Sequence, residues 1–292
     1  MILLCEGDSN GIDSIVLNKI LDNHTIHAVG SRFGMRHRIE VLRQVLNQPV
    51  YSILDRDFVI QWTQPVNQPI AWEVTHNSQR IRLGWFWERK EIENYLIDPL
   101  VVERVFAPHI KISTYQSALK EARDKITIYQ AARMTLSTIG RTGQYYLATS
   151  MGIVRGNNGY LFPTESSLNE DSCYQWVQET CDEYGQRHFT RKEKFSELFE
   201  MYKTDFLHGG ERYMKFLWAF SGKDLIYALE PWLTSHLNVN AQSFVNTIIK
   251  NLCSHDSISE WLPEWLCLKN DVDNYTRMAE PLACLQSTNQ IE

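Results

Sequence analysis

The chain of 292 residues lacks the features that mark several large classes of protein. Its six cysteines are scattered, with no Cys-x-x-Cys pair and no histidine at zinc-finger spacing, so we expect reduced thiols and no zinc site. No apolar run approaches the roughly 20 residues that a membrane-spanning helix needs. No Gly-x-x-x-x-Gly-Lys-Ser/Thr sequence is present, so any use of a nucleoside triphosphate would depend on a partner. These absences favour a cytoplasmic protein.

An excess of positive charge is also missing. The formal net charge is −6, which argues against a protein that coats nucleic acid unaided, because lysine and arginine supply most of the non-specific affinity for phosphates. A nucleic-acid enzyme of this composition needs a local basic patch or a partner. The length allows one large domain or two smaller ones, and 43% hydrophobic residues suffice for a sizeable core.

Residues 1 to about 100 alternate short apolar runs with amphipathic segments. The apolar runs predict strands and the amphipathic segments predict helices. Strands and helices in alternation predict a Rossmann-like α/β domain with a mostly parallel sheet. The expected strands are Ile2–Cys5, Thr25–Val29, Val50–Leu54 and Ile81–Trp87, the expected helices are Ile12–Leu21 and Met35–Leu46, and residues 58–79, with two prolines, are expected to be irregular.

Helical periodicity dominates after Pro99 and predicts a helical second domain over residues 101–292. Residues 140–158 are rich in glycine and receive no assignment. The expected helices are Leu100–Phe106, Thr114–Thr138, Leu168–Gln186, Lys192–Tyr202, Glu211–Trp218, Lys223–Leu233, Ala241–Leu252 and Ile258–Leu266.

Acidic side chains follow two of the expected strands. Glu6 comes directly after the first strand, and Asp55 and Asp57 come after the third. Each acid alone is more often a cap or a turn residue. In a parallel sheet, however, both strands end at the edge where ligands bind, and neighbouring carboxylates repel one another unless a cation compensates them. Oxygen ligands of this kind suit Mg²⁺, with Mn²⁺ as the usual substitute.

These motifs resemble a known family. Glu6-Gly7 after the first strand, Gly30 after the second, Asp55-Arg56-Asp57 after the third and the segment 91–96 are similar to the Toprim domain of topoisomerases, primases and OLD-family nucleases. More narrowly, they resemble the stand-alone Toprim effector that accompanies an ABC-type ATPase in the PARIS anti-phage defence system. The segment 220–225, Phe-Ser-Gly-Lys-Asp-Leu, is similar to an element of that group.

The resemblance implies a Toprim domain over residues 1–100, with residues 220–225 returning from the helical domain to the active site. It implies metal-dependent cleavage of DNA or RNA, with a host tRNA as one candidate substrate, by a toxic effector that an ATPase partner controls and that pairs as a homodimer when active. By this resemblance Glu6 is a general base or metal ligand, Asp55 and Asp57 are metal ligands, Glu93 is a further acid, and Lys223 stabilises charge on the scissile phosphate.

The chain departs from the Toprim pattern at one position. Many Toprim proteins carry an aspartate four residues after the glutamate, where this chain has Asn10. Asp8 and Asp13 lie to either side of Asn10, and either could replace the missing acid. The departure bears on the number of metal ions that the site would hold.

Basic side chains that could hold a nucleic-acid backbone are also present, although such runs are more often solvated helix faces. The candidates for nucleic-acid binding are Arg32, Arg36 and Arg38, with His37 among them, and Lys90; a second cluster comprises Arg187, His188, Arg191, Lys192 and Lys194.

Two other classes of function remain open. The segment Asp55-Arg56-Asp57-Phe58-Val59 fits the opening of phosphatases of the haloacid dehalogenase type, in which the first aspartate becomes phosphorylated. That family places the motif on its first strand, and neither it nor a sugar-nucleotide transferase with an Asp-x-Asp metal motif would use Glu6. A non-catalytic Toprim-fold docking or regulatory subunit of an ATPase complex is the second alternative.

Overall fold

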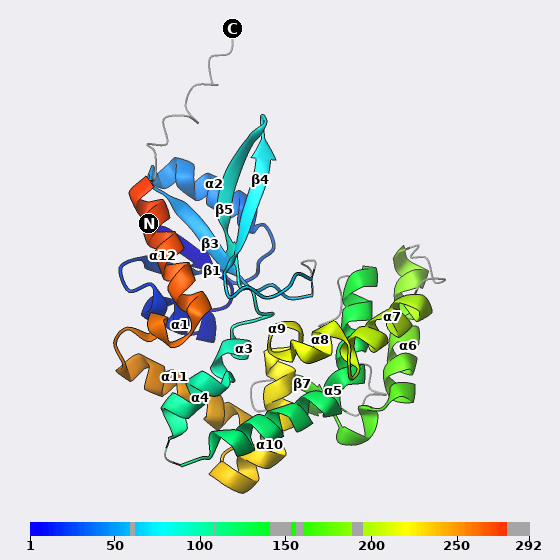
Figure 1. Ribbon diagram of the computed structural model, residues 1–292. Helices are drawn as coiled ribbons and strands as arrows, with labels where there is room; N and C mark the ends of the chain where they lie inside the picture. The colour runs from blue at the N-terminus through cyan, green and yellow to red at the C-terminus, as the bar shows by residue number, and fades with distance from the viewer. Residues whose placement is uncertain (59–61, 108, 141–152, 156–159, 189–194, 279–292) are drawn as a thin grey trace. The chain divides into compact units, whose positions relative to one another are not determined.

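The computed structural model describes residues 1–58, 62–107, 109–140, 153–155, 160–188 and 195–278. It is a mixed α/β protein, shown in Figure 1, and its contacts divide the chain into two compact units. We call them the α/β unit, which comprises residues 1–55, 65–88 and the chain from Ile249 on, and the helical unit, which comprises residues 56–64 and 89–248. Each unit is described by itself.

A five-stranded sheet forms the centre of the α/β unit. Its strand order is β2-β1-β3-β5-β4, in which β2, β1, β3 and β5 run parallel and β4 pairs antiparallel with β5 at the edge. The predicted α/β fold with a mostly parallel sheet is therefore confirmed. The strands are β1 (Ile2–Cys5), β2 (Thr25–Ala28), β3 (Val50–Leu54), β4 (Ile70–His76) and β5 (Gln79–Phe86).

Apolar side chains fill both faces of the central strands, as expected for parallel strands that helices cover. On one face Leu4 and Leu54 pack with Met35 and Ile39 of a helix that crosses between two strands. The preceding residue of β1, Leu3, points to the other face and is fully buried. The helices of the α/β unit are α1 (Ile12–Ile20), α2 (Met35–Leu46), the 3₁₀ helix η4 (Ile258–Trp261) and α12 (Pro263–Met278).

The last described helix, α12, belongs to the α/β unit and packs against its sheet. Its Tyr275 ring lies edge-on to Trp85 of β5, with ring centroids 5.7 Å apart, and Arg82 lies over the Tyr275 ring at 4.7 Å. This division differs from the expected boundary at residue 100, because the C-terminal segment belongs with the sheet rather than with the other helices.

Strand β4 corrects the expectation that residues 58–79 are irregular. Asn77 and Ser78 both have positive φ, 47° and 63°, which is the geometry of a tight two-residue hairpin turn. The turn joins β4 to β5, and the Trp72 and Phe86 rings on the two strands lie 5.5 Å apart. Asn-Ser is a weaker turn signal than Asn-Gly, so this hairpin was missed.

The long helix α5 is the centre of the helical unit and packs against α4, α6, α7 and α10. Side chains cap two other helices of the helical unit at their N-termini: Asp98 accepts a hydrogen bond from the backbone N–H of Leu100, and Ser221 accepts one from the backbone N–H of Asp224. The elements are α3 (Glu93–Leu96), α4 (Pro99–Phe106), α5 (Ile112–Gly140), β6 (Ile153–Arg155), β7 (Leu161–Pro163), η2 (Glu165–Ser167), α6 (Glu170–His188), α7 (Phe195–Phe206), α8 (Glu211–Met214), α9 (Phe216–Ala219) and α10 (Gly222–Leu237). Helix α11 (Ala241–Ser254) runs from this unit into the α/β unit.

Two of the expected helices are each divided in the structure. The helix expected over residues 211–218 is divided into α8 and α9 at Lys215, whose φ of −109° is not helical. The helix expected over residues 258–266 is instead a 3₁₀ turn, an extended Leu262 and a new helix that begins at Pro263, a residue suited to the first helical position.

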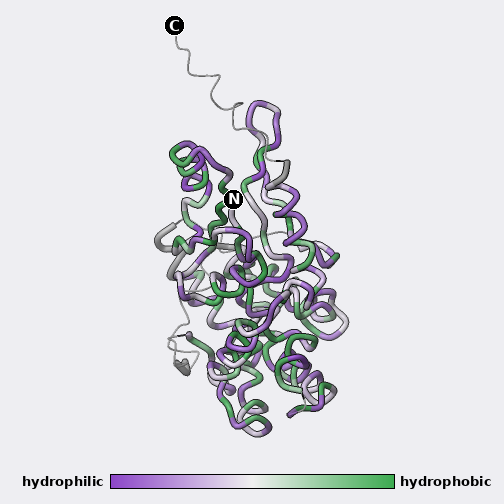
Figure 2. The backbone as a smooth tube through the Cα atoms, turned by 90° about the vertical axis from the view of Figure 1, so that its left-hand side faces the viewer, coloured by the Kyte–Doolittle hydropathy of each residue, from purple (hydrophilic) through white to green (hydrophobic). Residues whose placement is uncertain are grey.

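Hydrophobic and hydrophilic residues alternate along the chain, as the colours of Figure 2 show. Among the described residues, no helix combines the length and the apolar composition needed to cross a bilayer.

Candidate functional site

Two predicted site residues lie at one edge of the sheet in the α/β unit. Glu6 follows the last residue of β1, and Asp55 follows the last residue of β3. Because β1 and β3 pair in parallel, with Ile2 beside Val50 and Leu4 beside Ser52, their carboxyl ends coincide. Both acids are half-buried. The structure therefore places them as the sequence predicts, at the edge where α/β sheets bind ligands.

The pKa of the Cys5 thiol is affected by the carboxylates at this edge. Burial raises its pKa first, and the carboxylates of Asp13, Glu6 and Asp55 raise it further, to about 12. Three carboxylates therefore lie within electrostatic reach of one sulfur. Asp13 stands in the first turn of α1 and is one of the two acids that could replace the aspartate missing at Asn10. We name Glu6, Asp13 and Asp55 the carboxylate edge.

Two glycines join the loops beside the carboxylate edge. Gly7 and Gly30 exchange backbone hydrogen bonds of 2.8 and 2.9 Å, which ties the exit of β1 to the exit of β2. Both have positive φ, 79° and 78°, which favours glycine at each position. Both glycines were singled out in the sequence, and the structure brings them into contact.

The donors of the carboxylate edge suit a hard divalent cation. Their carboxylate oxygens are the ligands that Mg²⁺ and Mn²⁺ prefer. Within the described ranges, no group of three or more His, Cys, Asp or Glu side chains has the arrangement of a metal site. A cation there would therefore need water or substrate oxygens to complete its coordination.

Asp57 belongs to the helical unit, although it follows Asp55 by only two residues. Its φ of 50° is left-handed, a conformation that aspartate tolerates better than most residues, and its N–H donates to the Lys90 carbonyl at 2.9 Å. Its role beside Glu6 and Asp55 remains a prediction.

The helical unit brings together the two other motifs that the sequence singled out. The Lys223 ammonium lies 3.2 Å from a carboxylate oxygen of Glu91 and 3.2 Å from one of Glu93. The Asn94 side chain donates to the Phe220 carbonyl at 2.9 Å. Segments 91–94 and 220–225 therefore form one structure, although about 130 residues separate their lysine and glutamate in the sequence.

Burial and charge act in opposite directions on the two glutamates. Burial alone would raise the pKa of Glu91, but Lys223, Lys90 and hydrogen bonds from the Lys223 N–H and the Ser221 hydroxyl lower it to about 2. For Glu93 burial prevails over the Lys223 charge, and its pKa is raised. Glu91 is therefore the carboxylate that holds the lysine, and Glu93 is the acid whose proton is easier to retain.

A buried network beside this contact was missed by the sequence analysis. Asp224 is fully buried and accepts hydrogen bonds from Arg133, from Gln130 at 2.6 Å and from Tyr160 at 2.7 Å. Although burial lowers the pKa of Arg133, the Asp224 charge raises it well above the usual value. Polar residues at positions 130 and 133, within an otherwise apolar stretch of α5, are the signal that could have indicated the network.

Lys90 is placed differently from the expected nucleic-acid contact. Its side chain is buried, and its ammonium lies 3.0 Å from the centre of the Phe58 ring. Burial, followed by the Arg133 charge, lowers its pKa to about 7. The ammonium therefore presents no exposed surface to a phosphate.

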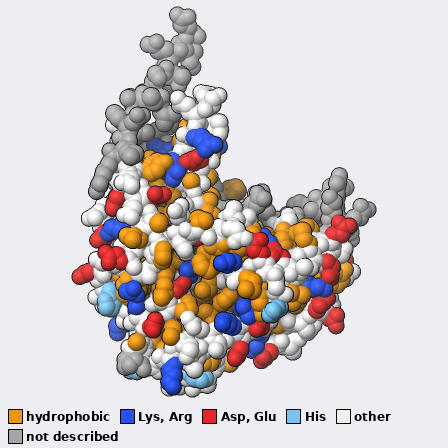
Figure 3. All heavy atoms as spheres, viewed as in Figure 1, with side chains coloured by type: hydrophobic (Ala, Val, Ile, Leu, Met, Phe, Trp, Pro, Cys, Tyr) orange, Lys and Arg blue, Asp and Glu red, His pale blue; other side chains and the backbone are white. Residues whose placement is uncertain are grey.

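The other basic candidates lie in the α/β unit and already make intramolecular contacts. Arg36 pairs with Glu40 at 2.8 Å, Arg38 donates to the Val29 carbonyl at 2.7 Å, and Arg32 lies 5.8 Å from the centre of the Phe86 ring. Figure 3 shows positive and negative side chains interspersed on the face in view. The side chains of the second basic cluster, at 187–194, lie outside the described residues.

Comparison with known proteins adds no assignment, since neither a protein-family model nor a curated protein matches this chain.

Proposed function

We propose that the protein is a Mg²⁺-dependent nuclease of the Toprim type that cleaves nucleic-acid phosphodiesters. The observation that supports the proposal best is the carboxylate edge, where Glu6 and Asp55 leave adjacent parallel strands and Asp13 adds a third acid within electrostatic reach of Cys5. Like charges at close range destabilise one another, so acids with only a structural role at strand ends are not expected to cluster in this way.

In this proposal Glu6 and Asp55 hold the divalent cation, which when bound polarises the phosphodiester and stabilises the leaving oxygen. The Glu6 carboxylate oxygen that does not bind the cation would accept a proton from the attacking water. Asp13 adds negative charge to the edge. Asp57, Glu93 and Lys223 are proposed to contribute on the basis of the resemblance, and single variants test each of them.

The substrate class and the control of the reaction also rest on the resemblance. We propose DNA or RNA, with tRNA among the candidates, as the substrate of a toxic anti-phage effector that an ABC-type ATPase holds inactive and that works as a homodimer. The net charge of −6 supports dependence on a partner, because the isolated chain would repel a polyanion at long range.

The test is cleavage by the purified chain, alone and with an ABC-type ATPase as the proposed partner. Labelled duplex DNA, single-stranded DNA and tRNA are incubated with Mg²⁺, Mn²⁺ or EDTA. Wild type should cut at least one substrate only with metal, Glu6→Gln and Asp55→Asn should lower the rate by about 100-fold or more, and Glu260→Gln, an exposed carboxylate of the same unit, should leave it unchanged.

Three outcomes would reject the proposal. If Glu6→Gln and Asp55→Asn cut as fast as wild type, the carboxylate edge is structural. If no chain cuts any substrate, either alone or with the ATPase, while all of them bind the ATPase, the protein is a docking subunit. A phosphorylated Asp55, trapped after incubation with a phosphate ester, would instead indicate phosphatase chemistry.

A further inference from the structure

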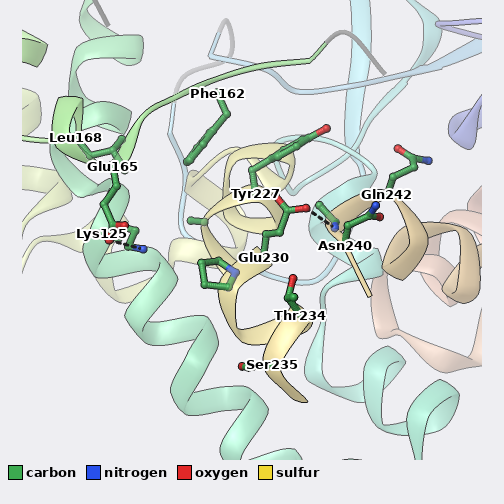
Figure 4. Close-up of a pocket in the computed structure, with 13 residues that line it drawn as sticks. Lys125, Phe162, Glu165, Leu168, Tyr227, Glu230, Thr234, Ser235, Asn240 and Gln242 are labelled. Atoms are coloured by element: carbon green, nitrogen blue, oxygen red, sulfur yellow. Dashed lines mark hydrogen bonds and ion pairs between the residues drawn. The ribbon is translucent and has the colours of Figure 1, made fainter. Parts of the chain in front are cut away.

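The helical unit contains a pocket of about 660 Å³ that the proposed nuclease reaction does not use. This volume lies within the range of small-molecule sites. Helix α10 provides one wall, and α5, β7, η2 and the start of α11 provide the others. Figure 4 shows Phe162 and Tyr227 at one end, Lys125 and Glu165 along one side, and Glu230 with Asn240 on the opposite side.

Aromatic rings line one end of the pocket, where a flat ligand could pack against them. Phe162 and Tyr227 are nearly parallel, with centroids 5.9 Å apart and an interplanar angle of 22°, and Tyr160 continues the stack on Tyr227 at 5.2 Å and 17°. Phe162 and Tyr227 are only half-buried although they line the pocket. Half-exposed rings held in this arrangement form an aromatic wall against which a flat heterocycle can pack.

Hydrogen-bond acceptors lie beside the rings. One oxygen of the Glu230 carboxylate accepts from the Ala241 N–H at 3.1 Å, which fixes the side chain, and in the described part of the chain its other oxygen has no donor. Pro231 stands inside α10 and has no N–H, so the Tyr227 carbonyl lacks its helical i+4 donor. Glu230 also raises the pKa of the Tyr227 hydroxyl, after burial, which shows that the carboxylate and the ring share one environment.

The charges of the lining oppose a phosphorylated ligand. Two acids, Glu165 and Glu230, and one cation, Lys125, stand among the described lining residues, and Lys125 pairs with Glu165 at 2.9 Å, so the net charge of this lining is negative. A neutral ligand with adjacent N–H donors suits this environment better than an anion. Guanine offers two such donors, N1–H and the 2-amino group, on one edge, whereas adenine and cytosine place an acceptor next to their amino group.

We propose that this pocket binds a guanine base, packed against the aromatic side chains of Phe162 and Tyr227 and recognised by the Glu230 carboxylate. The base belongs either to a free nucleoside or to an unpaired guanine of a nucleic acid, and the two sources share the same recognition. The proposal does not depend on the nuclease activity, because binding is measured in EDTA, where the proposed metal-dependent reaction cannot proceed.

The test is calorimetric titration of the full chain with guanosine, inosine, adenosine, cytidine and guanosine monophosphate, and with single-stranded hexaribonucleotides with and without one guanine. Guanosine should bind at least about tenfold more tightly than adenosine or cytidine, and inosine, which lacks the 2-amino group, should fall between. The monophosphate should bind no more tightly than guanosine. A hexamer that binds more tightly than guanosine identifies nucleic acid as the source, and equal or weaker binding identifies the free nucleoside.

Two variants locate the binding in the pocket. Glu230→Gln keeps an oxygen for the Ala241 N–H but loses the carboxylate, so it should lower guanosine affinity about tenfold and reduce the preference over adenosine. Phe162→Ala should lower the affinity for every nucleoside by at least about fivefold. Glu197→Gln, an exposed acid on α7, is the matched control, and thermal melting checks the fold of each variant.

The proposal is overturned if folded wild type binds no nucleoside at millimolar concentration. It is also overturned if guanosine and adenosine bind equally, or if Glu230→Gln binds guanosine as tightly as the Glu197→Gln control.

Discussion

Replacing Asp224 with asparagine should destabilise the protein by about 3–5 kcal/mol, because the substitution leaves the Arg133 guanidinium buried without its counter-charge. Asp224 is 0% exposed and Arg133 only 4%. Asparagine would keep one acceptor oxygen but would turn an amide NH₂ toward the donors of Arg133, Gln130 and Tyr160. The loss is a large fraction of the roughly 5–15 kcal/mol that stabilises an average domain.

The assay is urea unfolding at pH 7, followed by far-ultraviolet circular dichroism, with a check that the denaturant slope stays constant. Glu121→Gln, an exposed change on α5, should remain within about 0.5 kcal/mol of wild type. Arg133→Met should also destabilise the protein, and the double variant should lose at least about 1 kcal/mol less than the sum of the two single losses. A loss below about 1 kcal/mol for Asp224→Asn, or strictly additive losses, would refute the view that the two charges depend on one another.

Two further stability effects follow from the helical unit. Gly222→Ala should destabilise the protein by about 1–3 kcal/mol in urea unfolding, although alanine is normally preferred in helices, because the added Cβ would lie 2.5 Å from the Asn94 backbone nitrogen. The exposed Ser117→Ala is the control. A Gly222→Ala variant more stable than wild type would contradict this close contact. Lys90 has a folded pKa of about 7 against 10.5 for an ordinary lysine, so above pH 7 the unfolded state binds more protons. Wild-type stability should therefore rise relative to Lys90→Met, by up to about 1.4 kcal/mol per pH unit between pH 7 and 10, and a pH-independent difference would mean that Lys90 is solvated.

Local patterns made much of the α/β unit predictable. The apolar runs before Glu6 and Asp55 are short, β-branched or leucine-rich, and bounded by polar residues, so β1 and β3 were found within a residue of their ends. Helix α12 could not be assigned to the sheet in the same way. Its attachment depends on Tyr275 meeting Trp85, a contact between residues 190 positions apart that no local periodicity records.

The candidate site shows the same division between local and distant information. The placement of Glu6 and Asp55 follows from the rule that parallel strands end at one edge. In contrast, the burial of Lys90 under the Phe58 ring and the pairing of Arg133 with Asp224 depend on tertiary packing. In the sequence these residues look like ordinary surface charges, since lysine, arginine and aspartate are mostly exposed in folded proteins.

The central claim is that Glu6 and Asp55 hold a divalent cation. Electron paramagnetic resonance of Mn²⁺ titrated into the purified protein tests it directly, because bound and free Mn²⁺ give different signals and catalysis is not required. Wild type and the exposed control Glu260→Gln should bind Mn²⁺ with the same affinity, while Glu6→Gln and Asp55→Asn should each weaken it about tenfold or more. Binding that is unchanged in both variants would contradict the account.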